Sequence, residues 1–359
     1  MLYRQYRPRT WDQVIGQEHV VRTLQGALKA DRVGHAYLFA GPRGTGKTTL
    51  ARILAKAVNC TDGKKRPCDA CHSCKAIAQG ASLDVVEIDA ASNRGIDDVR
   101  GLKETAGTAP ASSTKKIFVI DEVHMLSKDA FNALLKLLEE PPAHAMFILA
   151  TTEPHKMLPT VLSRVQRFDF RKLTQSEIVG KLAFIAKSER LEAHPVALAA
   201  IAAAADGAFR DAEVMLTKLA ARTGGAPVTE DTVREVLGLV PIGWHARLAG
   251  LIAAGDRAGA LRFVQDAVQG GVDLDHFTKG FLECLRQVMM LKIDPTILAA
   301  DGLSDAHMSA LTELAGTMEG RLLVRMIQSF TDARARLRSA PVASLPLELS
   351  IIELTERAT

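Results

Sequence analysis

A glycine-rich stretch near the N-terminus has the residue types that bind phosphate: Gly41-Pro42-Arg43-Gly44-Thr45-Gly46-Lys47-Thr48. It matches the pattern G-x-x-x-x-G-K-[ST], in which glycines let backbone N–H groups converge on phosphate oxygens. Lys47 would reach the β- and γ-phosphates of a nucleotide, and the Thr48 hydroxyl would bind Mg²⁺. A chance glycine-rich turn is the alternative. An apolar run precedes the stretch and a helical pattern follows it, which is the strand–loop–helix context of a phosphate loop. The N-terminus of the following helix would add positive potential where the phosphates bind.

Two adjacent acids follow another apolar run, Ile117-Phe118-Val119-Ile120. Asp121 can hold Mg²⁺, directly or through water, and Glu122 can polarise an attacking water. The alternative is that both acids are solvated turn residues. This alternative is less favoured because the same chain carries an intact phosphate loop. The pair therefore predicts ATP hydrolysis and not nucleotide binding alone.

Four of the five cysteines lie within fifteen residues, at Cys60, Cys68, Cys71 and Cys74. The spacing C-x₇-C-x₂-C-x₂-C suits four thiolates around a tetrahedral structural Zn²⁺. Such clustering argues against a dispersed disulfide framework. Reduced thiols, an iron–sulfur cluster, or His72 in place of one cysteine are the alternatives. We predict a zinc site of four cysteines.

The elements that must position these residues alternate along the first 170 residues. Short apolar runs at 36–40, 85–88, 117–120 and 146–150 fit buried parallel strands. Helical patterns such as 48–58 and 127–138 lie between them. The alternation predicts an α/β domain with a mainly parallel sheet.

Strand signals fade after about residue 171. Thr174-Gln175-Ser176-Glu177 has the capping-box pattern that opens a helix. Helical segments continue to about residue 239, and residues 244–359 have helical patterns throughout, with Cys284 expected in their core. We therefore expect a nucleotide-binding α/β domain over 1–170, with the zinc module inserted at 60–74. A small helical domain over 171–240 and an all-α domain over 241–359 would follow.

Composition is that of an ordinary globular chain, with 359 residues, 47% hydrophobic and 24% charged. The longest apolar run, 196–205, is well short of the roughly 20 residues that span a bilayer. The N-terminus lacks the apolar core of a signal peptide, so we expect a cytoplasmic protein. Net charge is +4, but residues 1–60 hold ten basic and three acidic side chains. This excess indicates an anionic partner near the N-terminus.

The order of these features resembles the AAA+ ATPases, and within them the clamp loaders. Tyr6-Arg7-Pro8 and Val14-Ile15-Gly16-Gln17 look like the N-terminal stretch that packs round adenine in that family. Leu149-Ala150-Thr151-Thr152-Glu153-Pro154 resembles the sensor-1 strand. Leu162-Ser163-Arg164 resembles the Ser-Arg-Cys motif of clamp loaders, with Val165 where the family usually has Cys. Gly207-Ala208-Phe209-Arg210-Asp211-Ala212 resembles the sensor-2 helix.

The resemblance implies roles for three of these residues. Thr152 would read the γ-phosphate, Arg210 would contact it in cis, and Arg164 would act as a finger on the ATP of a neighbouring subunit. An arginine finger is worth about 10³–10⁵ in rate, so hydrolysis would depend on assembly. Both arginines have alternatives without a catalytic role: Arg164 could be an exposed helix-end cation, and Arg210 could pair with Asp211 or Glu213.

The predicted site falls into two sets. Glu122, Lys47 and Arg164 would be catalytic. The residues expected to bind ATP are Tyr6, Arg7, Val14, Ile15, Gly41, Pro42, Arg43, Gly44, Thr45, Gly46, Lys47, Thr48, Thr49, Thr152 and Arg210.

The cysteine module, with Asp89-Ala90-Ala91-Ser92 and Leu137-Leu138-Glu139-Glu140-Pro141-Pro142, resembles the γ/τ family of the bacterial DNA polymerase III clamp loader. Over residues 244–359 the chain is similar to the family's helical collar in position and helicity. This resemblance implies an ATPase of the polymerase III holoenzyme, with ATP, Mg²⁺ and Zn²⁺ as cofactors. Its partners would be further copies of itself, δ and δ′ relatives, the β sliding clamp and primer–template DNA, with no membrane.

DNA contacts would be to the phosphate backbone, because a loader must act at any sequence. Asn93 and Arg94 are the candidates by position in the family, and Arg94 could equally be a solvated loop residue. Two rival functions stay open. A branch-migration motor would need its own DNA-binding domain with strands, and a non-hydrolysing scaffold would be expected to lack Lys47, Asp121 or Glu122.

Overall fold

The computed structural model describes residues 2–63, 65–238, 240, 242–295, 305–337 and 339–356. They form two compact units, Met1–Glu230 and Asp231–Thr359, each with its own hydrophobic core. Residues 239 and 241, beside the expected boundary of the last domain, lie outside the described residues. The expected division of the first 240 residues near residue 170 stays a prediction.

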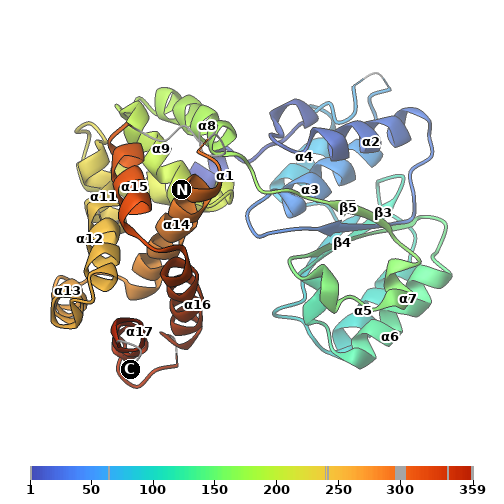
Figure 1. Ribbon diagram of the computed structural model, residues 1–359. Coiled ribbons are helices and arrows are strands. Elements are labelled where there is room, and N and C mark those ends of the chain that lie inside the picture. Colours follow the sequence, from blue (N-terminus) through green and yellow to red (C-terminus); the bar gives the residue numbers. More distant parts are fainter. Residues whose placement is uncertain are drawn as a thin grey trace. The chain divides into compact units, whose positions relative to one another are not determined.

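The first unit is built on a parallel five-stranded sheet with the order β2-β3-β4-β1-β5 (Figure 1). The strands are β1 (Ala36–Ala40), β2 (Val85–Asp89), β3 (Lys116–Asp121), β4 (Ala145–Thr151) and β5 (Gln166–Asp169). The sequence predicted the first four, each to within a residue at either end. It missed β5, in which only Phe168 is buried, because an edge strand needs no continuous apolar run.

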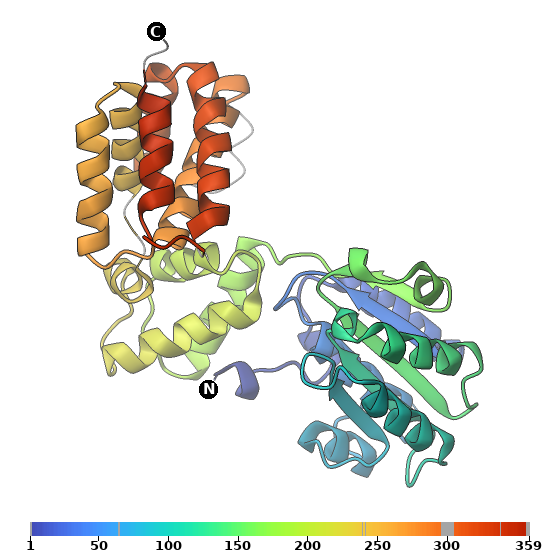
Figure 2. The same cartoon turned by 90° about the horizontal axis from the view of Figure 1, so that it is seen from below.

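Helices cover both faces of this sheet (Figures 1 and 2). On one face, Phe118 and Phe147 stack with ring centroids 5.3 Å apart, under α5, α6 and α7. On the other face, Tyr37 and Phe39 pack against α2 and α3. The helices of this layered part are α1 (Leu2–Gln5), η1 (Trp11–Gln13), α2 (Glu18–Lys29), α3 (Lys47–Val58), α4 (His72–Gln79), α5 (Ile96–Gly107), η2 (Val123–Met125), α6 (Lys128–Glu139), η3 (Pro154–Lys156) and α7 (Pro159–Leu162).

The rest of the first unit is helical, with α8 (Gln175–Ser188), α9 (Pro195–Ala204) and α10 (Phe209–Thr223). The predicted capping box is confirmed: the backbone N–H of Thr174 donates to Glu177 Oε2 at 2.8 Å, and the N–H of Glu177 donates to Thr174 Oγ1 at 3.3 Å. The short α1 packs against α10, so the N-terminus reaches this helical part (Figure 1).

The second unit contains helices and no strand in its described residues, as the sequence predicted. Helix α11 (Glu230–Leu237) crosses the boundary between the units. It is followed by α12 (Ile242–Ala253), α13 (Arg257–Gln269), α14 (Leu274–Ile293), α15 (Asp305–Thr317), α16 (Gly320–Leu337) and α17 (Leu345–Thr355). In its core, the ring centroids of Phe281 and Phe330 lie 4.7 Å apart. Cys284 is buried in the same core, as expected from the sequence. None of the described helices is long and apolar enough to cross a bilayer.

Candidate nucleotide-binding site

The phosphate loop connects the end of β1 to the start of α3, and its glycines are required by close packing. A Cβ at Gly41 would lie 2.4 Å from the backbone oxygen of Phe170, and one at Gly44 would lie 2.9 Å from the Cβ of Ala208. Gly46 has φ of 98° immediately before the helix. The loop therefore presents its backbone at the N-terminus of α3, where N–H groups and the helix dipole favour an anion.

Lys47 is folded back onto the loop. Its Nζ donates hydrogen bonds to the carbonyl oxygens of Gly41 and Pro42, both at 2.8 Å. Burial lowers the pKa of Lys47, while the negative charges of Glu122 and Asp121 oppose that shift. The ammonium thus lies beside the loop backbone, in reach of a group that the loop binds.

Thr48 and Asp121 meet across the site. Thr48 Oγ1 donates to Asp121 Oδ2 at 2.7 Å, although the two residues are 73 positions apart. Asp121 is the last residue of β3, at the carboxyl edge of the sheet. Hydroxyl and carboxylate oxygens are ligands that Mg²⁺ accepts, so the chemistry of this pair suits the ion, and Mg²⁺ binding here stays a prediction.

Glu122 follows in a left-handed backbone conformation, with φ of 49°. This conformation is uncommon for a residue with a side chain and costs free energy. The carboxylate Oε2 accepts hydrogen bonds from Thr152 Oγ1 at 2.8 Å and from Thr152 N at 3.2 Å. The strained turn after β3 therefore holds the Glu122 carboxylate against Thr152, which follows β4 and lies in the stretch that resembles sensor 1.

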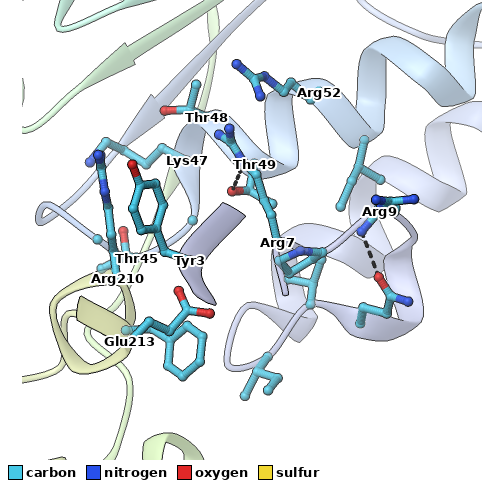
Figure 3. Close-up of a pocket in the computed structure, with 18 of the residues that line it drawn as sticks. Tyr3, Arg7, Arg9, Thr45, Lys47, Thr48, Thr49, Arg52, Arg210 and Glu213 are labelled. Atoms are coloured by element: carbon cyan, nitrogen blue, oxygen red, sulfur yellow. Dashed lines mark hydrogen bonds between the residues drawn. The ribbon is translucent and has the colours of Figure 1, made fainter. Parts of the chain in front are cut away.

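A cavity of about 690 Å³ joins the phosphate loop, the N-terminal stretch and the helices α8 and α10 (Figure 3). The predicted site residues that line it are Arg7, Val14, Ile15, Arg43, Gly44, Thr45, Gly46, Lys47, Thr48, Thr49, Asp121, Glu122 and Arg210. The predicted residues that do not line it are Tyr6, Gly41, Pro42, Thr152 and Arg164. Gly41 and Pro42 still contribute through the carbonyl groups that hold Lys47.

Two arginines reach the cavity from distant parts of the chain. Arg7 Nε donates to Thr49 Oγ1 at 3.0 Å, and burial lowers the pKa of Arg7 to about 10, which leaves it cationic at neutral pH. The Arg210 guanidinium lies 5.1 Å from the ring centroid of Tyr3. Figure 3 shows Arg210 on the same side of the cavity as Lys47. Tyr6 instead turns to α8, and its hydroxyl donates to Glu189 Oε1 at 2.6 Å.

Several lining residues were not predicted: Tyr3, Arg4, Pro8, Arg9, Gln13, Arg52, Ile53, Lys56, Ile77, Ala78, Leu173, Lys181, Phe209 and Glu213. Only three of them, Pro8, Gln13 and Phe209, lie next to a predicted residue in the sequence and could have been included by adjacency. Glu213 had a signal of its own, because it shares the buried face of α10 with Ala212 and Leu216. A charged residue among apolar residues on a buried helix face indicates a special environment.

Arg164 and Arg94 lie away from this cavity. Arg164 Nη1 donates to the carbonyl of Thr160 at 2.6 Å, and Nη2 pairs with Glu139 Oε1 at 2.7 Å, at the end of α6. Arg94 is exposed in the loop between β2 and α5, and its Nε donates to the carbonyl of Ala91 at 2.8 Å. Within this chain, neither arginine contacts the phosphate loop.

The four clustered cysteines meet between α3 and α4, with sulfur atoms all within 4.8 Å of one another. A tetrahedral zinc ion with Zn–S bonds of about 2.3 Å needs sulfur separations of about 3.8 Å, so the cluster fits this ion. Backbone N–H groups point at the sulfurs, including Cys71 N to Cys68 Sγ at 3.3 Å and Cys74 N to Cys71 Sγ at 3.4 Å. Such N–H groups stabilise thiolates, the form that binds metal.

The sheet, the phosphate loop after β1, the acids after β3 and the helical part beyond β5 define this chain as a P-loop protein of the AAA+ class. In agreement, a RuvB mutant from Thermotoga maritima superposes with a TM-score of 0.50 at 22% identity, covering 75% of this chain and 87% of that one, which supports the fold alone. Two family models match, "DNA polymerase III, delta subunit" over residues 16–174 and "DNA polymerase III subunits gamma and tau domain III" over residues 228–359.

Among curated relatives, the chain is 33% identical to DNA polymerase III subunit gamma of Buchnera aphidicola, over 99% of this chain and 96% of that protein. It is 38% identical to DNA polymerase III subunit tau of Bacillus subtilis, over 99% of this chain and 63% of that protein. It is 36% identical to the tau subunit of Escherichia coli, over 98% of this chain and 54% of that protein. The chain belongs to the γ/τ subunit family of bacterial DNA polymerase III. It spans 63% of the B. subtilis tau subunit's length and 61% of the gamma/tau subunit of Mycobacterium tuberculosis.

Proposed function

We propose that this chain is the ATP-hydrolysing motor subunit of a DNA polymerase III clamp loader, which opens the β sliding clamp and loads it onto primed DNA. The observation that carries the proposal is the contact of Thr48 with Asp121 beside Lys47 and Glu122 in one cavity. Family membership supplies the replication role. Acting on chromosomal DNA would place the protein in the cytoplasm.

The chain's own residues would divide the work of phosphoryl transfer. The loop backbone and Lys47 bind the phosphates, while Glu122 accepts a proton from the attacking water. Thr152 orients Glu122 through the hydrogen bonds described above. Arg210 would contact the γ-phosphate from α10. When bound through Thr48 and Asp121, Mg²⁺ would neutralise charge on the phosphates.

Arg164 would act on the ATP of a neighbouring subunit. Its place outside the cavity of its own chain supports this assignment, since a finger in trans has to lie on another surface. Assembly with further copies of this chain and with δ and δ′ subunits would then be needed for hydrolysis. Zinc held by the four cysteines would be structural, because four thiolates leave no open coordination position. Contacts of Arg94 with the DNA backbone are part of the same proposal.

The rival functions have less support. The likeness to RuvB shows a fold and no activity, and the described residues of 231–359 contain no strand pair for a winged helix. A non-hydrolysing scaffold does not need Lys47, Asp121 and Glu122, which lie together here. Hydrolysis, not polymerase chemistry, is therefore the activity proposed for this chain.

The test is ATP hydrolysis by the complex assembled from this chain, δ, δ′ and the β clamp. We expect primed DNA together with the clamp to raise the steady-state rate at least tenfold over the complex alone. A Glu122→Gln subunit should still assemble and bind ATP but should lose the stimulated rate. Hydrolysis that is insensitive to both clamp and primed DNA would contradict the loader function. Absence of any hydrolysis would contradict the motor role.

A further inference from the structure

The buried carboxylate of Glu213 has no task in the phosphate chemistry described above. Glu213 is only 4% exposed, and it lines the cavity from α10, three residues after Arg210. Figure 3 shows its carboxylate directed from α10 toward Tyr3. Its Oε1 is buried without a hydrogen-bond partner among the described residues. Because such burial costs free energy, the carboxylate calls for a donor that the bound ligand would bring.

Neighbouring cations attract Glu213 but are engaged elsewhere. Lys181, Arg210 and Arg7 all favour its ionised form, yet burial dominates and raises the pKa of Glu213 to about 7. The Lys181 ammonium lies 5.1 Å from the ring centroid of Phe184, and Arg210 lies over Tyr3. The carboxylate thus has electrostatic support without a hydrogen bond to Oε1.

The position of Glu213 along α10 indicates which part of a nucleotide it faces. Residues three apart lie on one helix face, about one turn or 5 Å apart. Arg210 is on the Lys47 side of the cavity, so Glu213 is one turn removed from that guanidinium (Figure 3). A carboxylate would repel phosphate, and the hydrogen-bond donors of a nucleotide other than Mg²⁺-bound water belong to its nucleoside. These donors are the ribose hydroxyls and the exocyclic amino group of adenine.

We propose that Glu213 is a specificity-determining residue that accepts a hydrogen bond from a donor on the nucleoside part of the bound nucleotide. The inference rests on the proposed function, because it assumes that the cavity binds ATP. It adds a hydrogen-bond acceptor for the nucleoside to a site in which the N-terminal stretch is expected to pack round adenine and the remaining assigned side chains act on phosphates, metal and water. The donor is a ribose hydroxyl or the adenine amino group, and analogues that lack one donor at a time distinguish them.

The experiment measures equilibrium binding of four nucleotides to the full chain. They are ATP, 2′-deoxyATP, 3′-deoxyATP and purine riboside triphosphate, which lacks the amino group. The proteins are the wild type, Glu213→Leu, Glu213→Gln and, as a matched control, Glu192→Gln at an exposed position between α8 and α9. Circular dichroism on each variant confirms folding, and leucine replaces glutamate in the cavity wall with a similar volume.

At pH 8, above the pKa of Glu213, we expect the wild type to bind one analogue about tenfold or more weakly than ATP, since a hydrogen bond to a charged group has this effect. Glu213→Leu should weaken ATP binding to a similar degree. It should abolish the preference for ATP over that one analogue and leave the preferences over the other two unchanged. Glu213→Gln, which keeps a carbonyl acceptor, should retain part of the preference, and the control should match the wild type.

Unchanged ATP affinity in Glu213→Leu would overturn the inference, as would tighter binding. The inference would also be contradicted if Glu213→Leu lost ATP affinity but kept the wild-type preference for ATP over each of the three analogues. The carboxylate would then act only through its charge. In each of these results the wild type binds ATP, so the proposed function stands. Failure of the wild type to bind any of the four nucleotides would instead refute the proposed function, and this inference with it.

Discussion

The ammonium of Lys56 pairs with the carboxylate of Asp69 and so joins the helix after the phosphate loop to the segment that carries the cysteines. Lys56 is 2% exposed, and its Nζ also donates to the backbone oxygen of Arg9 at 2.9 Å. Trp11 Nε1 donates to the carbonyl of Arg66 at 2.8 Å in the same region. Since Lys56 and Arg9 line the cavity, the cysteine module and the nucleotide site share structural supports.

Replacing Lys56 with methionine should therefore affect both stability and binding. The variant keeps the aliphatic stem but leaves the Arg9 carbonyl and Asp69 without their donor. We expect the free energy of unfolding to fall by about 2 kcal/mol. This is the size of effect for breaking an ion pair in which the lysine is buried and the aspartate is partly exposed. ATP affinity should fall severalfold, as measured by calorimetry. Lys75→Met, at an exposed position on α4, is the control that should change neither quantity.

Metal removal tests the cysteine site. Purified protein should contain one zinc per chain, and a chelator should lower both the thermal unfolding temperature and the ATP affinity, because the segment that holds Asp69 loses its anchor. Cys71→Ala should lose the metal. Cys284→Ala should retain it, since that thiol is buried in the core of the second unit. Metal analysis of the native protein that finds no zinc would show the four-cysteine site to be wrong.

Two substitutions separate nucleotide binding from catalysis in trans. Lys47→Ala should abolish ATP binding, because it removes the cation that the loop carbonyls hold. Arg164→Ala should bind ATP normally but lower hydrolysis by the assembled complex about 10³-fold or more. Glu139→Gln is the matched control: it breaks only a partly exposed ion pair with Arg164, so the rate should change little. Normal hydrolysis by the Arg164→Ala complex on primed DNA would refute the finger assignment.

Acid should weaken the start of α8. Hydrogen bonds from Arg171 lower the pKa of Glu177 to about 2, with Thr174 adding to the effect against partial burial. A carboxylate whose pKa is depressed on folding stabilises the protein above its unfolded pKa, near 4.5, and this stabilisation is lost as pH falls toward 2.

Urea unfolding at several pH values checks this effect. The difference in free energy of unfolding between wild type and Glu177→Gln should shrink by about 1–3 kcal/mol from pH 6 to pH 3, allowing for solvent screening. Glu192→Gln should show no such trend. A difference that stays constant over this range would contradict the role of Glu177.

Much of the first unit could be predicted from contiguous sequence. Apolar runs identified four strands, and the capping box at Thr174 gave the start of α8 to the residue. The phosphate loop, the acids at 121 and 122 and the cysteine cluster are also local patterns, in which a few neighbouring residues satisfy one chemical requirement. Such patterns can be recognised because their function depends on spacing along the chain, which folding does not alter.

The tertiary structure alone decided the direct contacts between distant residues. Thr48 contacts Asp121 only because parallel strands bring their carboxyl ends to one edge of the sheet. Tyr3, Lys181 and Glu213 join the cavity through the packing of α1, α8 and α10, and Arg164 is directed to Glu139 by the junction of α6 with α7. These contacts depend on the angles and depths at which elements pack. Many side chains set those angles jointly, so no short stretch of sequence specifies them.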